Sequence, residues 1–336
     1  MAYCTVSIAG AQNDSRFGKS QFPIKSFIEK KGEGFEQQSL LKNLFRMDPS
    51  SNFGEKYTGE TAMDDFEPVG EGGNYPTTGT EEGYDQTLVH MTWKNRFTVT
   101  REMVDDNKIG DMRKKANKFI TAYDQTREKF GRALYVGGLT GNTMSYGGKT
   151  FKCGSADGLA LFSKVHPNKV NKKTQSNLYA DAFSLDALGK METAMQNTKG
   201  DNGELLSVTP DTIWIPNDAV LKNTVFAAIG ADKDPATANN AYNYQYGRWN
   251  IMVDPYLTLM LAMLGITTYK PWFMLDSRFL TDQDGAVFLD RTKLDVTSVV
   301  DSSNDNNIWN GYARFTGGFV DWRFIAAGGV TGGSAL

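Results

Sequence analysis

The amino-acid sequence predicts an α+β fold in which strands and a long helix occupy separate stretches of the chain. Apolar and polar residues alternate from Val89 to Val99, which is the pattern of a half-buried strand. From Met112 to Leu134, apolar residues recur at every third or fourth position, as in an amphipathic helix. Alternation returns between residues 294 and 326. Sheet-forming segments therefore lie on both sides of a helical region.

Length and composition limit the class of protein. The 336 residues suffice for two or three compact units, and a net charge of −3 leaves no basic footprint for nucleic-acid binding. Cys4 and Cys153 are too few for a disulfide framework or a four-ligand zinc site, so we expect free thiols in a reducing cytoplasm. No signal peptide is evident. The apolar stretch over 255–269 is shorter than the roughly 20 residues of a spanning helix, which favours a buried core segment.

The first 40 residues are predicted to form an extended arm. They are polar, carry several glycines and show no sustained period. Their apolar residues are too many for a solvated tail and are expected to anchor the arm on another surface. These residues are Phe17, Phe22, Ile24, Phe27 and Ile28.

A long hairpin is predicted to follow the arm. A weak strand over 53–63 would precede the strand over 89–99, with His90 on the polar face of the second strand. Residues 64–86 between them are irregular and rich in Gly, Pro, Thr and acids. An isolated hairpin is marginally stable in water, and structureless loops above about 15 residues are uncommon inside compact domains. We therefore expect this hairpin to lie on an external partner.

The long helix has a predicted start, interruption and end. Thr100 is a suitable N-cap, Gly110 is expected to kink or interrupt the helix, and Gly137–Gly138 should end it. The apolar stripe consists of Met112, Ala116, Phe119, Tyr123, Phe130 and Leu134. The opposite face is predicted to be basic and carries Arg113, Lys114, Lys115, Lys118, Arg127, Lys129 and Arg132.

Residues 184–270 are predicted to form a separate α/β unit. Its expected elements are a helix capped by Ser184, a strand over 212–215 closed by Pro216, a helix over 218–229 and a strand over 248–253. Strands over 294–300, 308–315 and 319–326 should follow, the last two joined by a hairpin turn at Gly317–Gly318.

No catalytic or cofactor motif is complete. Gly148-Lys149-Thr150 and Gly18-Lys19-Ser20 lack the first glycine of a phosphate-binding loop. The acidic runs near 282–285 and 301–307 lack the spacing of calcium loops and are expected to be turns. His166 follows Cys153 closely, but nothing orients such a pair for nucleophilic catalysis. We expect no enzyme, no cofactor and no metal site.

A series of short motifs follows in order along the chain. They are Asp157-Gly158, Leu161-Phe162-Ser163, His166-Pro167, Asn177-Leu178, Ser184-Leu185, Ile215-Pro216, Val253, Pro255, Leu257, Trp272-Phe273 and Tyr312-Ala313-Arg314. This series and the order of elements resemble the major capsid proteins of tailed bacteriophages, which have the Hong Kong-97-type fold. The closest likeness is to the Mu-like major head subunit family, over roughly residues 40–330.

The resemblance implies a division of the chain into named regions. They are an N-terminal arm (1–40), an extended E-loop hairpin (41–100), a P-domain with a spine helix (101–183), an A-domain at capsomer centres (184–270) and a C-terminal β hairpin returning to the P-domain (271–336). The type member of the fold crosslinks an E-loop Lys to an Asn of a neighbour. Residues 57–93 contain no Lys or Arg, so this crosslink is not carried over.

The resemblance also implies partners and a location. The subunit would form hexamers and pentamers of an icosahedral shell in the virion, assembled in the host cytoplasm around double-stranded DNA. A separate scaffolding protein is implied because no long scaffold segment precedes the shell-like pattern, and a portal and a decoration protein are further expected partners. DNA contacts should be non-specific, mainly through phosphates, and no membrane is involved.

Opposite charges on two segments predict the contacts between copies. The E-loop hairpin, called the acidic arm from here on, carries the acids Glu60, Asp64, Asp65, Glu67, Glu71, Glu81, Glu82 and Asp85. We expect them to lie against a neighbour's spine helix, at Arg113, Lys114, Lys115 and Lys118. One alternative is an encapsulin-like bacterial nanocompartment, which would contain cargo enzyme and no DNA. A remote alternative is a nucleotide- or metal-dependent enzyme, which the incomplete motifs and the scarcity of His and Cys argue against.

Overall fold

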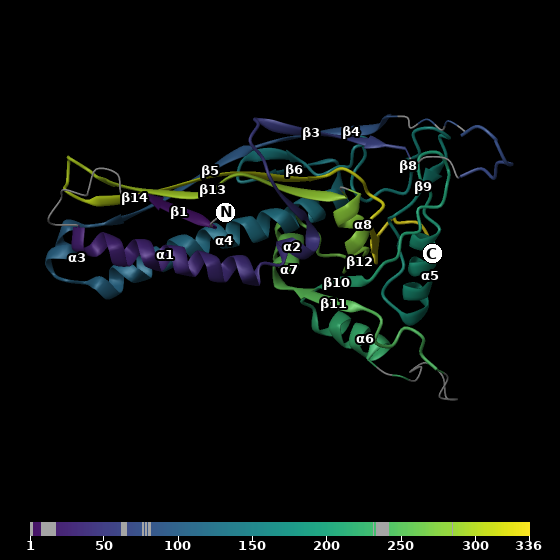
Figure 1. The fold of residues 1–336 in the computed structure, drawn as a ribbon. Helices are drawn as coiled ribbons and strands as arrows, with labels where there is room; N and C mark the ends of the chain where they lie inside the picture. Colours follow the sequence, from purple (N-terminus) through teal and green to yellow (C-terminus); the bar gives the residue numbers. More distant parts are fainter. Residues whose placement is uncertain are drawn as a thin grey trace.

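The protein has an elongated body with a second unit set at an angle to one end (Figure 1). The computed structural model describes residues 3–7, 18–61, 66–75, 77, 79, 82–230, 232, 242–283 and 285–336. On the left of the view, a long sheet lies over two helices, and on the right a smaller sheet and its helices extend downward. A loop of residues 66–75 projects at the far right.

The long sheet has the strand order β1–β13–β14–β5 within the described residues, with β2 also beside β13. Its strands are β1 (Cys4–Ser7), β2 (Arg46–Pro49), β5 (Met91–Val99), β13 (Ala286–Val300) and β14 (Asn307–Phe319). β13 and β14 form an antiparallel hairpin, and residues 301–306 make its turn as expected. Helix α4 (Ile109–Thr140) packs on one face of this sheet, where Phe130 meets Phe315 edge to face at 5.9 Å.

Helix α4 confirms the predicted apolar stripe and corrects its ends. All six stripe residues are buried. Thr100 caps a short helix α3 (Arg101–Asp105), but the break before α4 falls at Asn107, whose φ of 56° is left-handed, while Gly110 lies inside α4. Gly137 and Gly138 do not end the helix. They allow close packing, because an added Cβ would lie 2.9 Å from Met144 and 2.8 Å from Leu161.

The N-terminal segment is not an extended arm where it is described. Residues Gly18–Gln38 form helix α1, which packs along α4 and against β1. Ile24 and Ile28, one turn apart, are buried. The internal Pro23 disfavours a helix, so packing of the apolar face overrides local preference here. Phe17 and the side chain of Phe22 lie outside the described residues.

The predicted hairpin exists, but its second strand is a different one. β3 (Gly54–Glu60) pairs with β4 (Glu82–Val89), and β5 instead pairs with β14 in the long sheet. The reason is Leu88, which is buried against Val287 and Leu289 and so fastens β4 to the sheet. His90, between β4 and β5, is buried, so its placement on a polar strand face was wrong.

Gly317 and Gly318 lie inside β14 and make no turn. An added Cβ at Gly318 would lie 2.3 Å from Leu88, and one at Gly317 would lie 2.9 Å from Leu134. The two glycines therefore let the hairpin approach one face of the sheet and α4 the other. The following strand, β15 (Ile325–Gly328), joins the second sheet.

The second sheet has the order β11–β10–β12–β15 among the described strands. Its other strands are β10 (Thr212–Pro216), β11 (Asn250–Asp254) and β12 (Trp272–Leu275). Helices α5 (Leu185–Gln196), α6 (Ala219–Ile229), α7 (Pro255–Met263) and α8 (Ser277–Asp282) surround it, with α2 (Leu41–Leu44) near the junction. The predicted cap Ser184 is confirmed, and Asp218, predicted as the first residue of its helix, is the N-cap of α6. The stretch over 255–269 is only partly buried, since Met263 is exposed.

Two small hairpins complete the described fold. They are β6 (Thr143–Tyr146) with β7 (Lys149–Lys152), and β8 (His166–Pro167) with β9 (Thr174–Gln175). Phe151 of β7 stacks on Trp93 at 6.0 Å, so the first hairpin extends the aromatic core.

A buried ionic cluster joins the two units. Arg132 of α4 is fully buried, and its Nε donates to Asp254 at 2.7 Å while its Nη1 pairs with Glu128. Asp254 also accepts from the backbone N–H of Tyr256 at 2.8 Å and so caps α7. One carboxylate therefore connects the spine helix, β11 and α7.

We expect Asp254→Asn to lower the free energy of unfolding by about 3 kcal/mol, because the fully buried Arg132 loses the carboxylate that its Nε contacts and keeps Glu128 alone of its two acidic partners in this cluster. Asp186→Asn is the control, since Asp186 pairs with Lys190 on the surface and its loss should change stability by less than about 1 kcal/mol. Denaturant unfolding of both variants measures the difference. Equal losses of stability in the two variants would contradict a stabilising role for Asp254 in the buried cluster.

Candidate inter-subunit surfaces

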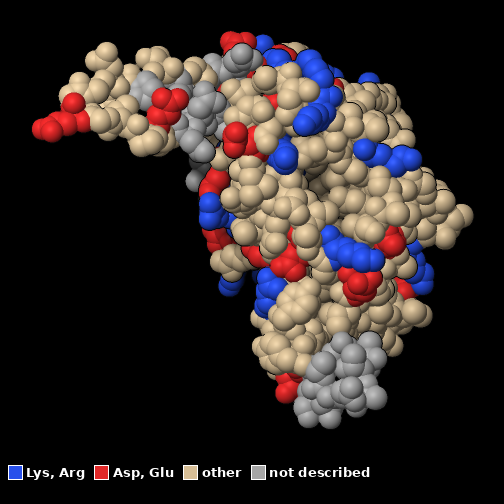
Figure 2. All heavy atoms as spheres, turned by 90° about the vertical axis from the view of Figure 1, so that its right-hand side faces the viewer, with Lys and Arg blue, Asp and Glu red and all other residues tan. Residues whose placement is uncertain are grey.

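The loop beyond β3 and β4 projects from the body without covering any of it. Phe66 and Tyr75 are almost fully exposed, at 104% and 96%, and Val69 is also exposed. Figure 2 shows this loop extending away from the body, with acidic side chains at its end. Exposed aromatic residues on a projecting loop are typical of a surface that another molecule covers.

The structure places five of the eight predicted acids. Glu60, Glu67, Glu71, Glu82 and Asp85 are exposed, whereas Asp64, Asp65 and Glu81 lie outside the described residues. Asp85 is already engaged within the hairpin, since it pairs with Lys56 at 2.9 Å. This pair lowers the pKa of Asp85, mainly through the hydrogen bond from Lys56. Glu67 and Glu71, on the projecting loop, are the acids best placed for a neighbour.

The basic face of α4 is narrower than predicted. Arg127 and Arg132 are buried in ion pairs, and the exposed cations gather in the first turns of the helix. Arg113, Lys114 and Lys118 are exposed, with Lys114 3.1 Å from Asp111. Lys115 is half-buried and donates to the carbonyl oxygen of Thr98 on β5 at 2.8 Å.

The acidic loop and this basic cluster lie at opposite ends of one subunit. In Figure 1, the loop is at the far right, and α3 with the start of α4 is at the far left. The acidic loop of a subunit therefore does not reach the basic cluster of the same subunit. A contact between unlike surfaces of identical chains is heterologous, and it closes into a ring when the rotation between copies allows.

Lys169 fastens the base of the arm, and sequence analysis missed it. Its Nζ donates to the carbonyl oxygens of Glu82 and Gly83 at 2.6 Å and 2.5 Å, and it lies 5.7 Å from the centre of the Tyr84 ring. The contact joins residues 86 positions apart, so no local pattern could have revealed it.

His90 sits where the arm joins the long sheet. One ring nitrogen, Nε2, lies 2.7 Å from Ser50 Oγ, on the segment that leads into β3. Burial lowers the pKa of His90, and the nearby cations Arg314 and Arg291 lower it further. The folded junction therefore favours the neutral imidazole of His90.

The motif residues Asp157, His166 and Asn177 converge in one buried network. His166 Nδ1 lies 2.6 Å from Asp157 Oδ2, its Nε2 lies 3.2 Å from Asn177 Oδ1, and its ring stacks on Trp322 at 4.3 Å. Both ring nitrogens are occupied, which suits a structural role. Cys153 donates instead to the carbonyl oxygen of Gly141, and burial raises the pKa of its thiol to about 12. A reactive thiolate does not form there at neutral pH.

Other kinds of site are not found in the residues that the structure describes. Both cysteines are free and buried. Across these ranges, no group of three or more His, Cys, Asp or Glu side chains could hold a metal ion. No described helix combines the length and apolar character needed to cross a membrane.

The subunit thus combines a projecting loop that carries exposed acids with an exposed basic cluster at the far end of its body. A family model described as phage capsid protein matches residues 84–328, and the chain belongs to this family. It is a structural protein of the phage head, not an enzyme, and its place is the virion. No curated protein matches the chain.

The family match and one solved structure bear out the predicted Hong Kong-97-type fold. A chain from Mycobacterium phage Patience aligns with a TM-score of 0.50 at 10% identity, covering 91% of this chain and 87% of that one. A chain from Gordonia phage Cozz gives 0.49 at 11%, covering 86% and 85%. The procapsid of bacteriophage JBD30 gives 0.45 at 14%, covering 91% and 74%. At such identities the likeness is one of fold alone.

Acidification should loosen the junction at His90. Because its folded-state pKa lies below the ordinary 6.5, the stability it contributes is present above about pH 6.5 and is lost as the pH falls below that value. We expect amide exchange of residues 84–92, corrected for intrinsic rates, to rise severalfold between pH 7.5 and pH 5.5. His90→Gln should show a smaller pH dependence, and equal dependence in both proteins would refute this role.

Proposed function

We propose that this major capsid protein forms hexamers and pentamers of an icosahedral shell around double-stranded DNA, and that the acidic arm of each copy docks on the start of the spine helix of a neighbour. The observation that carries the proposal is the placement of Glu67 and Glu71 at one end of the subunit and Arg113, Lys114 and Lys118 at the other. With the two charged surfaces at opposite ends, the acids of one subunit can meet the cations of another subunit but not its own.

The proposed docking is non-covalent, and its total strength depends on the number of equivalent contacts in the shell. One exposed ion pair contributes on the order of 0–1 kcal/mol. Hundreds of equivalent contacts in a shell can still steer association and fix register, because complementary potentials act on encounter and orientation. The arm offers no cation for a lysine crosslink between residues 57 and 93.

The regional division belongs to the same proposal. The E-loop is assigned within 41–100, with β3, β4 and the loop as its projecting part. The P-domain comprises 101–183 and 271–336, the A-domain 184–270, and the N-terminal region 1–40. The ordered motifs, with Asp157, His166 and Asn177 joined in one network, support a relation to the Mu-like major head subunits.

Further partners follow from this role. A separate scaffolding protein, a portal and a decoration protein are proposed, with assembly in the host cytoplasm and non-specific contacts to packaged DNA. An encapsulin-like compartment would share the fold, but the phage capsid family match favours the phage shell. The contents of purified particles separate the two, since DNA supports the phage head and cargo enzyme supports the compartment.

Reversing the charges of Lys114 and Lys115 should block shell closure while the subunit still folds. Acids in the first turns of a helix are favoured by its dipole, and losing the hydrogen bond from Lys115 to Thr98 should cost about 1 kcal/mol, so Lys114→Glu with Lys115→Glu should not unfold the subunit. Negative-stain microscopy of the expressed protein should show closed shells for the wild type and open or unassembled material for the double variant.

A charge swap makes this test specific. Adding Glu67→Lys and Glu71→Lys to the double variant should restore closed shells, since the signs are complementary again. Lys172→Glu with Lys173→Glu, at a distant exposed loop, is the control and should assemble normally. Normal shells from the Lys114/Lys115 variant would refute the docking.

A further inference from the structure

A small cavity opens between α4 and the edge strand β5. Its volume is about 120 Å³, and its walls are mainly aromatic and apolar, including Trp93, Phe119, Tyr123 and Phe315. Asn95 and Lys94, which also line it, are exposed and mark its mouth.

The cavity arises from a gap in the aromatic row that faces α4. Trp93, Asn95 and Phe97 alternate onto one side of β5, because successive strand residues point to opposite faces. Trp93 stacks on Phe315 at 4.8 Å, and Phe97 stacks on Trp309 at 5.9 Å.

Asn95 lies between these two stacks, and its cross-strand partner is Gly311, which has no side chain. The Phe119 ring fills the space beside Gly311, since an added Cβ there would lie 2.4 Å from it, and the cavity stays open beside the exposed Asn95. Asn95 is also the residue that interrupts the apolar alternation of this strand in the sequence.

The α4 residues that line the cavity begin at Phe119, directly after the basic cluster of the proposed docking surface. Lys115 lies one turn before Phe119, and its ammonium group reaches β5 at Thr98. Lys118 immediately precedes Phe119, and Lys94 stands at the mouth. An occupant that carries negative charge beside an apolar side chain would match both features.

The projecting arm carries such a pair. Phe66 is fully exposed, and Glu67 follows it directly. A cavity of about 150 Å³ holds a benzene ring, so a space of this order accepts much of a phenyl group. Tyr75 is equally exposed, but its hydroxyl would need a partner when buried, whereas Phe66 has no polar atom to satisfy.

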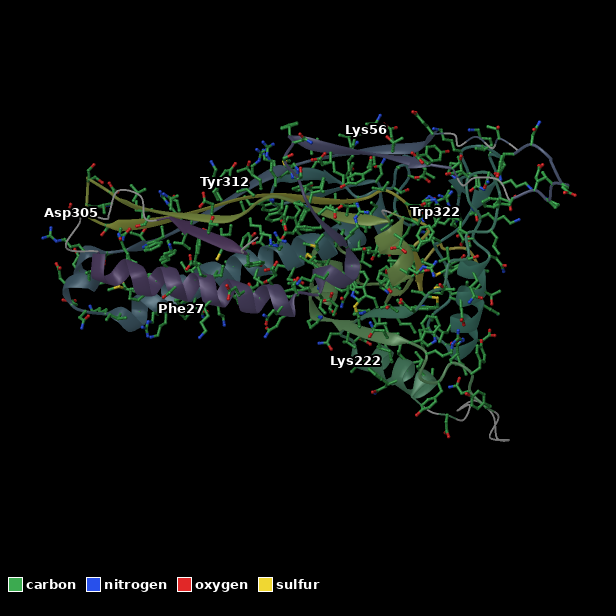
Figure 3. The ribbon with its side chains drawn as sticks, in the orientation of Figure 1. Phe27, Lys56, Lys222, Asp305, Tyr312 and Trp322 are labelled. Carbon is green, nitrogen blue, oxygen red and sulfur yellow. The ribbon has the colours of Figure 1, made fainter. Side chains whose placement is uncertain are left out.

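The occupant must come from another copy. In Figure 3, Tyr312, which lies between the cavity residues Gly311 and Ala313, is in the left half of the body, while the loop is at the far right. We propose that Phe66 of one subunit inserts into the cavity between α4 and β5 of its neighbour and anchors the arm there. This inference rests on the proposed arm docking and adds its apolar anchor.

The reach of both segments agrees with this placement. With Phe66 in the cavity, Glu67 is adjacent and Glu71 lies within about 17 Å along an extended chain. Along α4, Lys115 and Ala122 are separated by about 10 Å. Both glutamates can therefore meet cations around the mouth while the ring is buried.

The test compares assembly of full-length variants as a function of protein concentration. Phe66→Ala should raise the concentration needed for shell formation by about 10-fold or more, since one buried aromatic ring is worth at least a power of ten in an association constant. Tyr75→Ala, the same loss of exposed aromatic surface on the same loop, should change it less than about 3-fold. Asn95→Leu, which fills the gap from inside, should match Phe66→Ala without lowering the melting temperature, and the combined variant should be no worse than either.

Cysteine pairing locates the contact directly. Shells of the Phe66→Cys, Asn95→Cys variant, mildly oxidised, should give ladders of covalent multimers on denaturing gels, while Tyr75→Cys, Asn95→Cys shells should not. Native Cys4 and Cys153 are buried and do not compete. If shells form but no ladder appears, or if Phe66→Ala assembles like the wild type, the anchor is refuted and the arm docking stands. If the wild type forms no shells, the proposed function fails as well.

Discussion

Two buried arginines of α4 hold the spine helix to both sheets, and the shape of the subunit depends on them. Arg127 makes a two-pronged contact with Asp290 of β13, at 2.5 Å and 2.8 Å, and lies 4.9 Å from the centre of the Phe288 ring. Arg132 reaches Asp254 at the start of α7. Separating either pair would remove a counter-charge from a buried arginine, which opposes a change in the angle between the units. A rigid body of this kind can present its arm and its docking surface at fixed positions.

Much of the fold could be predicted from patterns among residues that are close together in the sequence. The spacing of the α4 stripe and the caps at Thr100 and Ser184 depend on neighbouring residues alone, and the structure confirms them. The basic face was overestimated because Arg127 was counted as a surface cation. It lies four residues after Tyr123 and three before Phe130, so the spacing itself places it on the buried stripe.

Features set by distant contacts could not be predicted in this way. Gly317–Gly318 matches a turn in sequence, but Leu88 and Leu134, which approach the two glycines from opposite faces, make it part of a strand. Helix α1 forms despite Pro23 because α4 provides a surface for Ile24 and Ile28. The sequence indicated opposite charges on the arm and the helix. Their location at opposite ends of the subunit, which restricts the proposed contact to different copies, required the three-dimensional fold.

The central claim is that identical subunits join through unlike ends, with the arm of one on the spine helix of the next. A cryo-electron microscopy map of the assembled shell tests this most directly. If the subunits join in this way, residues 66–75 of one subunit lie against residues 113–122 of its neighbour, with carboxylate and ammonium groups within about 4 Å. A map in which the arm folds back on its own subunit, or contacts a neighbour elsewhere, would contradict it.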